Sequence, residues 1–333
     1  MQKGTYRIEP FQDTDAQEVT DLIKEVYGDK FPIETISDPV ALLTAVKEEK
    51  FIPFVARSSD NRIAGFTAVY PLAPYKGVRE MGLTVARRQD RNQGISGLLF
   101  DYGLTVVAQK VGIELMYGEA VCNHTYTQRA IAKLKVPVVE TGLALDIMPA
   151  EAYEKEKSAS GRVAAVCIFG VIARKPHRVY IPAVYNKSLP FIYENIEDKR
   201  TLLPSTDPLP AGKQTNVSIQ PVGDSGMGRL IVHEAGEDFD RIFGRQEEEL
   251  MKSGHAVLQA WLKLASPSVG DAVDRLRKKG YCLGGVLLRW FDEDGLLMQK
   301  VTGLPNWEGI HIHSERMKKV TDFVKQDWLE TNR

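Results

Sequence analysis

The chain has 333 residues, enough for two domains of ordinary size. Its 43 basic and 44 acidic residues give a formal net charge of -1, so no global field favours nucleic acid or an anionic membrane as a partner. Cys122, Cys167 and Cys282 lie far apart without metal-ligand spacing, which indicates buried thiols in a reducing compartment. No signal-peptide core and no membrane-length apolar run is present, so we expect a cytoplasmic protein.

The first 150 residues are predicted to form a mixed α/β domain, because runs of alternating polarity are interleaved with runs of helical periodicity. Three features stand out between the strands: a turn-forming SSDNR segment, a glycine-bearing turn after 79–85, and a long amphipathic helix after that turn. The expected elements, in chain order, are a strand at 5–11, helices at 13–31 and 38–49, a hairpin at 50–73, a strand at 79–85, the helix after Gly94, a strand at 113–122, a helix at 125–134 and a strand pair at 136–149.

A charged, serine-containing segment at 151–162 is predicted to be a linker to a second domain, 163–333. The proline-rich segment 202–215 is expected to be a surface loop. The rest of this domain repeats the strand–helix–strand–helix–strand order, and a DEDG turn predicts a hairpin. The expected elements are strands at 163–173, 228–235, 256–265, 282–291 and 296–301, and helices at 239–254, 269–281 and 314–330.

The segment RRQDRNQGISG, residues 87–97, places basic and small residues where a strand leads into a helix. Such a turn leaves backbone N–H groups unpaired at the positive end of the helix dipole, which suits a phosphate or pyrophosphate. Gly94 allows close approach, Ser96 and Gly97 keep the next turn small, and Arg91 adds a cation. The alternative is an ordinary strand-to-helix turn with a solvated basic face. The spacings of the P-loop and of the dinucleotide-binding fingerprint are both absent.

Residues 91–99, RNQGISGLL, resemble motif A of the GNAT acetyltransferase superfamily, (Arg/Gln)-x-x-Gly-x-(Gly/Ala), with Ser96 at the third position. The order of elements before the motif also resembles that fold, over roughly residues 4–148. The resemblance implies acetyl-CoA or another acyl-CoA as cofactor, with its pyrophosphate on the turn and its pantetheine arm in a splay between the fourth and fifth strands. The cofactor-binding residues that it implies are Leu83, Thr84, Val85, Arg91, Asn92, Gln93, Gly94, Ile95, Ser96, Gly97 and Asn123.

Two departures from the family pattern bear on the expected chemistry. The segment TVARRQDR is one residue longer than the pattern, which predicts a bulge or a shifted register after the fourth strand. Ile131 falls where the family often has a general-acid tyrosine, and Lys135–Val136 replaces its Gly-Phe pair. Tyr126, one helical turn earlier, is a candidate for the acid, and its alternative is a packing role.

Acyl transfer to an amine needs a base, a donor to the oxyanion and an acid for the leaving thiolate. Glu80 and Glu119 are carboxylates in otherwise apolar strands beside the expected splay, and desolvation there would suit a base. His124, at the end of the fifth strand, is a further candidate base. With Tyr126 these residues are the predicted catalytic groups, although each of them could instead be a structural or solvated side chain. The resemblance implies that the oxyanion donor is the backbone N–H near Val85.

The second half resembles the family only in part. Residues 271–290 are similar to its motif B helix and the strand that follows, but no cofactor motif opens a helix. The glycine-rich segment 223–229 precedes a strand, so it is predicted to be a loop. His311 and His313 share one face of an extended segment without a third ligand, and no metal site is expected. We therefore predict a degenerate GNAT-like domain that lines the acceptor side of the first domain or holds a homodimer together.

The predicted fold class is α/β, with tandem GNAT-like domains, each a mixed, mostly antiparallel sheet flanked by helices. The predicted function is acyl-CoA-dependent N-acyl transfer, most simply of acetyl, to a small-molecule or peptide amine by direct attack in a ternary complex. The alternative is a catalytically silent acyl-CoA-binding module that regulates a partner. A weaker alternative, transfer from aminoacyl-tRNA, lacks the basic groove that it would need.

Overall fold

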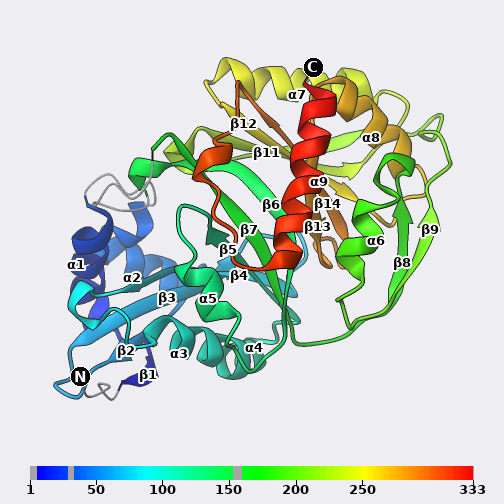
Figure 1. The fold of residues 1–333 in the computed structure, drawn as a ribbon. Helices are drawn as coiled ribbons and strands as arrows, with labels where there is room; N and C mark the ends of the chain where they lie inside the picture. The colour runs from blue at the N-terminus through cyan, green and yellow to red at the C-terminus, as the bar shows by residue number, and fades with distance from the viewer. Residues whose placement is uncertain (1–5, 29–33, 153–159, 333) are drawn as a thin grey trace.

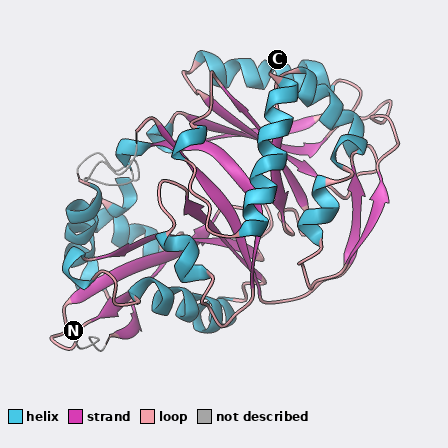
Figure 2. Ribbon diagram, in the orientation of Figure 1, coloured by secondary structure: helices cyan, strands magenta, loops and turns pink. Residues whose placement is uncertain are grey.

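The computed structural model describes residues 6–28, 34–152 and 160–332 (Figure 1). One sheet of 12 strands runs through the molecule, in the order β1-β2-β3-β4-β5-β7-β6-β13-β14-β12-β11-β10. The helices lie outside this sheet (Figure 2). No helix among the described residues is long and apolar enough to cross a membrane.

The N-terminal elements are β1 (Arg7–Pro10), α1 (Ala16–Tyr27), α2 (Pro39–Lys47), β2 (Ile52–Arg57), β3 (Ile63–Pro71), β4 (Val78–Ala86), α3 (Ile95–Tyr102), a π-helical turn (Gly103–Val107), α4 (Ala108–Val111), β5 (Leu115–Val121), α5 (Tyr126–Ile131), β6 (Val138–Pro149) and β7 (Arg162–Val171). Helices α1 and α2 pack on one face of β2 and β3, where Val55 and Phe66 are buried. Helix α3 packs on the other face, with Phe54 and Val69.

The C-terminal elements are β8 (His177–Ile181), α6 (Ser188–Tyr193), β9 (Arg200–Pro204), β10 (Asn216–Pro221), β11 (Met227–Glu234), α7 (Phe239–Lys252), β12 (Val257–Lys263), α8 (Val269–Lys278), β13 (Cys282–Leu287), β14 (Gly295–Val301) and α9 (Glu315–Thr331). Strands β8 and β9 form a separate parallel pair that the sequence had not predicted. The predicted loop 202–215 begins inside β9.

The two halves of the sheet repeat one strand order in opposite directions. From its edge toward the middle the second half reads β10-β11-β12-β14-β13, and the first half reads β3-β4-β5-β7-β6 after two additional edge strands, β1 and β2. In each half one pair is parallel, β4 with β5 and β11 with β12, and the other pairs are antiparallel. The predicted fold class is thereby confirmed: each half is a mixed, mostly antiparallel sheet flanked by helices.

The halves meet where β6 pairs with β13, at Gly142 and Gly285. An added Cβ at Gly285 would overlap the backbone of Gly142. The φ of Gly285, 144°, also suits glycine alone. Gln299 is fully buried at the same junction and donates to the carbonyls of Leu143 (2.9 Å) and Leu283 (3.1 Å). Both halves therefore share one continuous core.

The segment predicted as a linker, 151–162, connects β6 to β7, and its residues 153–159 lie outside those described. Strand β7 pairs with both β5 and β6, so it lies within the sheet of the first half, beyond the boundary expected at residue 150. The strand pair expected at 136–149 is wrong, because β6 is one strand of 12 residues. Two register shifts, at Glu140/Gly142 and Ala144/Met148, let it bend without ending.

Candidate functional site

The turn before α3 holds its small residues open to solvent. A short 3-10 turn (Arg88–Asp90) follows β4, and it accommodates the extra residue that the sequence showed. Gly94 precedes the helix with φ of 82°, and the first bond of the helix runs from Leu98 N to Gly94 O (3.1 Å). The N–H groups of residues 95–97 therefore precede the hydrogen-bonded part of the helix. An added Cβ at Gly94 or Gly97 would meet no atom within 4 Å.

Strands β4 and β5 separate beside this turn. Their parallel pairing ends at Glu80 and Tyr117, although β4 continues to Ala86 and β5 to Val121. Leu83 has a φ of 59°, close to a register shift in the pairing of β3 with β4. The splay thus leaves part of the backbone of β4 without a strand partner on that side.

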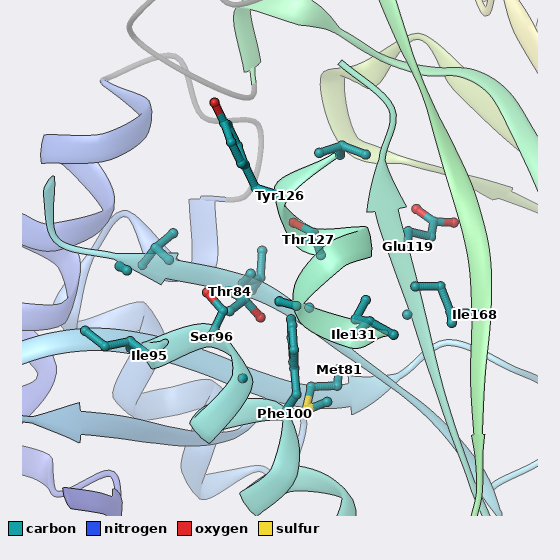
Figure 3. A pocket seen from close by; sticks show the side chains of 18 of the residues that line it. Met81, Thr84, Ile95, Ser96, Phe100, Glu119, Tyr126, Thr127, Ile131 and Ile168 are labelled. Carbon is teal, nitrogen blue, oxygen red and sulfur yellow. The ribbon is translucent and has the colours of Figure 1, made fainter. Parts of the chain in front are cut away.

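A cavity of about 590 Å³ joins the turn to the splay (Figure 3). In Figure 3, Ser96 and Thr84 lie on one side of it and Ile131 and Ile168 on the other, with Phe100 and Met81 between them. The volume is in the usual range for a small-molecule site. The predicted site residues in its lining are Leu83, Thr84, Val85, Arg91, Asn92, Gly94, Ile95, Ser96, Gly97, Glu119, Asn123, His124 and Tyr126, whereas Gln93 and Glu80 are not among the described residues that line it.

The two carboxylates of the splay have different surroundings. Glu119 lines the cavity and accepts a hydrogen bond from Tyr117 Oη (2.8 Å). Burial raises the pKa of Glu80 to about 8, and the charge of Glu119 adds to this rise, whereas Arg229 and a hydrogen bond from Tyr70 oppose it. The pKa of Glu80 therefore lies near neutral pH, and its carboxyl group is largely protonated at pH 7.

Helix α5 brings two further candidates to the mouth of the cavity. The rings of His124 and Tyr126 lie 4.9 Å apart between centroids, and both residues line the cavity. Tyr126 is 71% exposed, and Figure 3 shows its hydroxyl pointing away from Glu119. Ile131, at the place of the family's tyrosine, lines the apolar end instead. Tyr117 also lines the cavity, and its hydroxyl donates to the carboxylate of Glu119.

The second half reaches the site through an extended segment. His311 N donates to Cys122 O (2.8 Å), directly beyond β5. The buried Gln128 of α5 donates to His311 O (2.9 Å) and accepts from His313 N (2.8 Å). The two histidines therefore hold α5 through their backbone. No cluster of three or more potential metal ligands occurs among the described residues.

Sequence reasoning missed two residues of this site. Tyr117 belongs to an apolar strand, and its hydroxyl contact with Glu119 becomes visible only when alternate residues of β5 share a face. Burial raises the pKa of Tyr117 well above its usual value, and Cys167 and Glu119 add to this. Gln128 contacts residues more than 180 positions away, which no local pattern reports.

No protein-family model and no curated protein sequence matches the chain. Solved structures match about half of it. The ribosomal-protein-S5-alanine acetyltransferase from Vibrio fischeri is 11% identical, and the match covers 50% of this chain and 93% of that one with a TM-score of 0.40. An N-acetyltransferase from Staphylococcus aureus Mu50 is 12% identical over 50% and 99%, with a TM-score of 0.42.

A third match is the spermidine N-acetyltransferase from Vibrio cholerae in complex with CoA and spermine. It is 10% identical over 50% of this chain and 95% of that one, with a TM-score of 0.40. All three are acetyltransferases, which is the activity of the superfamily that residues 91–99 resemble. At these identities and TM-scores, no residue role carries over from them to this chain.

Proposed function

We propose that the first half is an acyl-CoA-dependent N-acyltransferase. One observation carries the proposal: a single cavity is lined both by the open N-terminus of α3 and by the splayed segment Leu83–Val85. The first feature suits a pyrophosphate, because N–H groups and the helix dipole face the ligand. The second offers unpaired strand backbone to the amides of a pantetheine arm. An acyl-CoA, with acetyl-CoA as the simplest case, has both groups in one molecule.

The residues at the splay fit the chemistry of the transfer. The reaction forms a C–N bond, breaks the C–S bond of the thioester and moves one proton from the amine to the leaving thiolate. Glu119 lines the cavity and would take the proton from the incoming ammonium group. Tyr117, which donates to Glu119, would relay a proton or hold that carboxylate in place. Glu80 would act indirectly, because its carboxyl group is mostly neutral at pH 7 and therefore adds little negative charge next to Glu119.

The acceptor would enter from the mouth of the cavity, beside His124 and Tyr126. We propose an amine acceptor, either a small molecule or a peptide, because carboxylates stabilise an ammonium group there. The second half would contribute to this side through the segment that holds α5.

One observation favours a catalytically silent acyl-CoA-binding module instead. Ile131 provides an alkyl side chain where a hydroxyl acid would otherwise stand. Such a module would bind acyl-CoA with the same turn and release no thiol with any amine. A coupled assay of thiol release over a panel of amines separates the two functions.

Binding is tested first, by calorimetric titration of acetyl-CoA into the wild type and a Gly97→Trp variant. The new side chain would fill the cavity, and Gly97 has no positive φ that would strain the substitution. We expect at least about 100-fold weaker binding, since the indole displaces the pyrophosphate. Arg241→Trp is the matched control, at the third residue of α7 with a side chain 71% exposed. Wild-type protein that binds no CoA compound would contradict the proposed function.

A further inference from the structure

The cavity continues past the splay, across β5 and onto β7. Gly118 on β5 pairs with Ile168 on β7, and Met116 pairs with Gly170 in the next position on the same face. All four residues line the cavity. Gly118 leaves room above the sheet surface where a larger side chain would otherwise stand, whereas Leu104 covers Gly170.

The walls around this floor are apolar. Among the described residues at this end, the side chains in the lining are Met81, Phe100, Leu104, Met116, Ile131 and Ile168. Figure 3 shows Phe100 next to Met81, Ile131 between Phe100 and Ile168, and Glu119 next to Ile168. They come from α3, the π-helical turn, α5 and three strands, so the whole fold of the first half converges on this space.

The far end is closed by residues that can adjust. Leu104 lies directly over Gly170, where an added Cβ would overlap its side chain. The π-helical turn presents Leu104, and in the same turn Gly103 leaves the space that the Met81 sulfur occupies. Methionine is unbranched and flexible, so Met81 can repack around ligands of different length more easily than a branched or aromatic side chain could.

A polar group would be poorly accommodated in this space. The backbone of β5 is paired with β7 from Leu115 to Val121, so its N–H and C=O groups on that side are already satisfied. Tyr117 alternates with Met116 and Gly118 along β5, so its side chain lies on the other face, where its hydroxyl donates to Glu119. A pantetheine amide placed here would lose its hydrogen bonds with water and gain none. An alkyl chain has no such cost and is favoured by burial.

We propose that this end of the cavity holds an acyl chain longer than acetyl, so that the donor is a medium-chain, saturated acyl-CoA. The inference rests on the proposed function, because it requires the thioester to lie at the splay between Met81 and Gly118. An acetyl group would end there, short of the floor at Ile168 and of Leu104, which covers Gly170. Each further methylene buries apolar surface against that floor.

The test is a calorimetric titration of CoA, acetyl-CoA, butanoyl-CoA, hexanoyl-CoA and octanoyl-CoA into the full chain. We expect the affinity to rise about fourfold for each added methylene until the chain meets Leu104. Equal affinity for acetyl-CoA and all longer chains, or weaker binding of the longer ones, would overturn the inference while leaving the proposed function intact. Binding of none of the five compounds would overturn both.

Two variants test whether the dependence of affinity on chain length arises from this end of the cavity. Ile168→Phe shortens the cavity from β7, and Gly118→Val fills it from β5, where an added Cβ lies an ordinary 3.4 Å from Met81 O. Either variant should lower the ratio of octanoyl-CoA to acetyl-CoA affinity at least tenfold. If Ile168→Phe does not fold, Gly118→Val provides the same test. An unchanged ratio in a folded variant would overturn the inference. Gly97→Trp should weaken all chain lengths, which excludes non-specific adsorption of the alkyl chain.

Discussion

The turn between a strand and the next helix is open before α3 in the first half and filled before α7 in the second half. Before α3, Gly94 and Gly97 face open space. The equivalent turn of the second half, residues 235–238, is filled by its own chain: Gly236 N donates to Thr215 Oγ1 (3.0 Å) and Glu237 N donates to the carbonyl of Lys213 (3.2 Å). Two donors that could hold an anion are therefore already satisfied, and the local side chains are acidic.

The two strand splays show the same contrast, because the one in the first half is more open. Pairing of β4 with β5 ends after three residue pairs, whereas β11 and β12 pair over five, from Met227 to Ile231. The cavity at the splay has about 590 Å³ in the first half, and that of the second has about 50 Å³. One strand order thus supports one open cavity and one nearly closed cavity, so the presence of a ligand-sized site depends on the local residues and not on the fold.

The largest effect is expected from the carboxylate of the open splay. Two residues past the last paired position, the first half has Glu119 and the second has Lys263. Glu119→Gln should lower kcat by about 10²–10⁴-fold, because the amide cannot take a proton, and should leave the affinity for acyl-CoA within about threefold. Steady-state kinetics with an amine found in the thiol-release screen provides the measurement.

Lys263→Gln is the matched control for that variant and should leave kcat unchanged. An equal loss of kcat in both variants would mean that the second half takes part in the chemistry, and the contrast between the halves would fail. Unchanged kcat in Glu119→Gln would transfer the role of base to another group.

Adding a methyl group to the two turns should have opposite consequences. A Cβ at Gly236 would overlap the carbonyl oxygen of Lys213, so Gly236→Ala should lower the free energy of unfolding by about 1–3 kcal/mol. Gly97→Ala places its methyl in open space and replaces a glycine inside a helix, which should stabilise the protein by about 0.5–1 kcal/mol. Urea unfolding of both variants measures the difference. Similar values for both would show that the turn at Gly236 yields easily.

Most of the fold could be predicted because each element has a local signal. The helix α1 shows it well: Val19, Leu22, Ile23 and Val26 recur at helical spacing, and all four are buried. Strand order has no such signal. The charged segment 151–162 is as typical of a hairpin loop as of a linker, so the position of β7 between β5 and β6 could not be read locally.

Those parts of the site that are formed by residues consecutive in the sequence could be predicted. The turn around Gly94 and the strand end at Leu83–Val85 are short motifs, and both line the cavity. The apolar floor was not predictable, because it combines Gly118 with Ile168 through the register of two strands. A one-residue slip of that register would turn both residues to the other face.

The smallest expected effect concerns Glu80, which has no charged counterpart in the second half, where Ile231 ends the paired segment. Its pKa of about 8 lies above the usual 4.5. The folded state therefore binds the proton more tightly, so this contribution to stability is fully present below about pH 4.5 and is lost as the pH rises through about 8. Glu80→Gln should stabilise the protein at pH 9 relative to pH 5, by about 1–2 kcal/mol once partial exposure of the side chain is allowed for. Thermal unfolding at both pH values gives the measurement.

The control is Glu234→Gln, at an exposed position on β11, which should change the free energy of unfolding by less than about 0.5 kcal/mol at either pH. A Glu80 variant that behaved in the same way would show that this carboxyl group does not titrate near pH 8, and the electrostatic difference between the two halves would be lost.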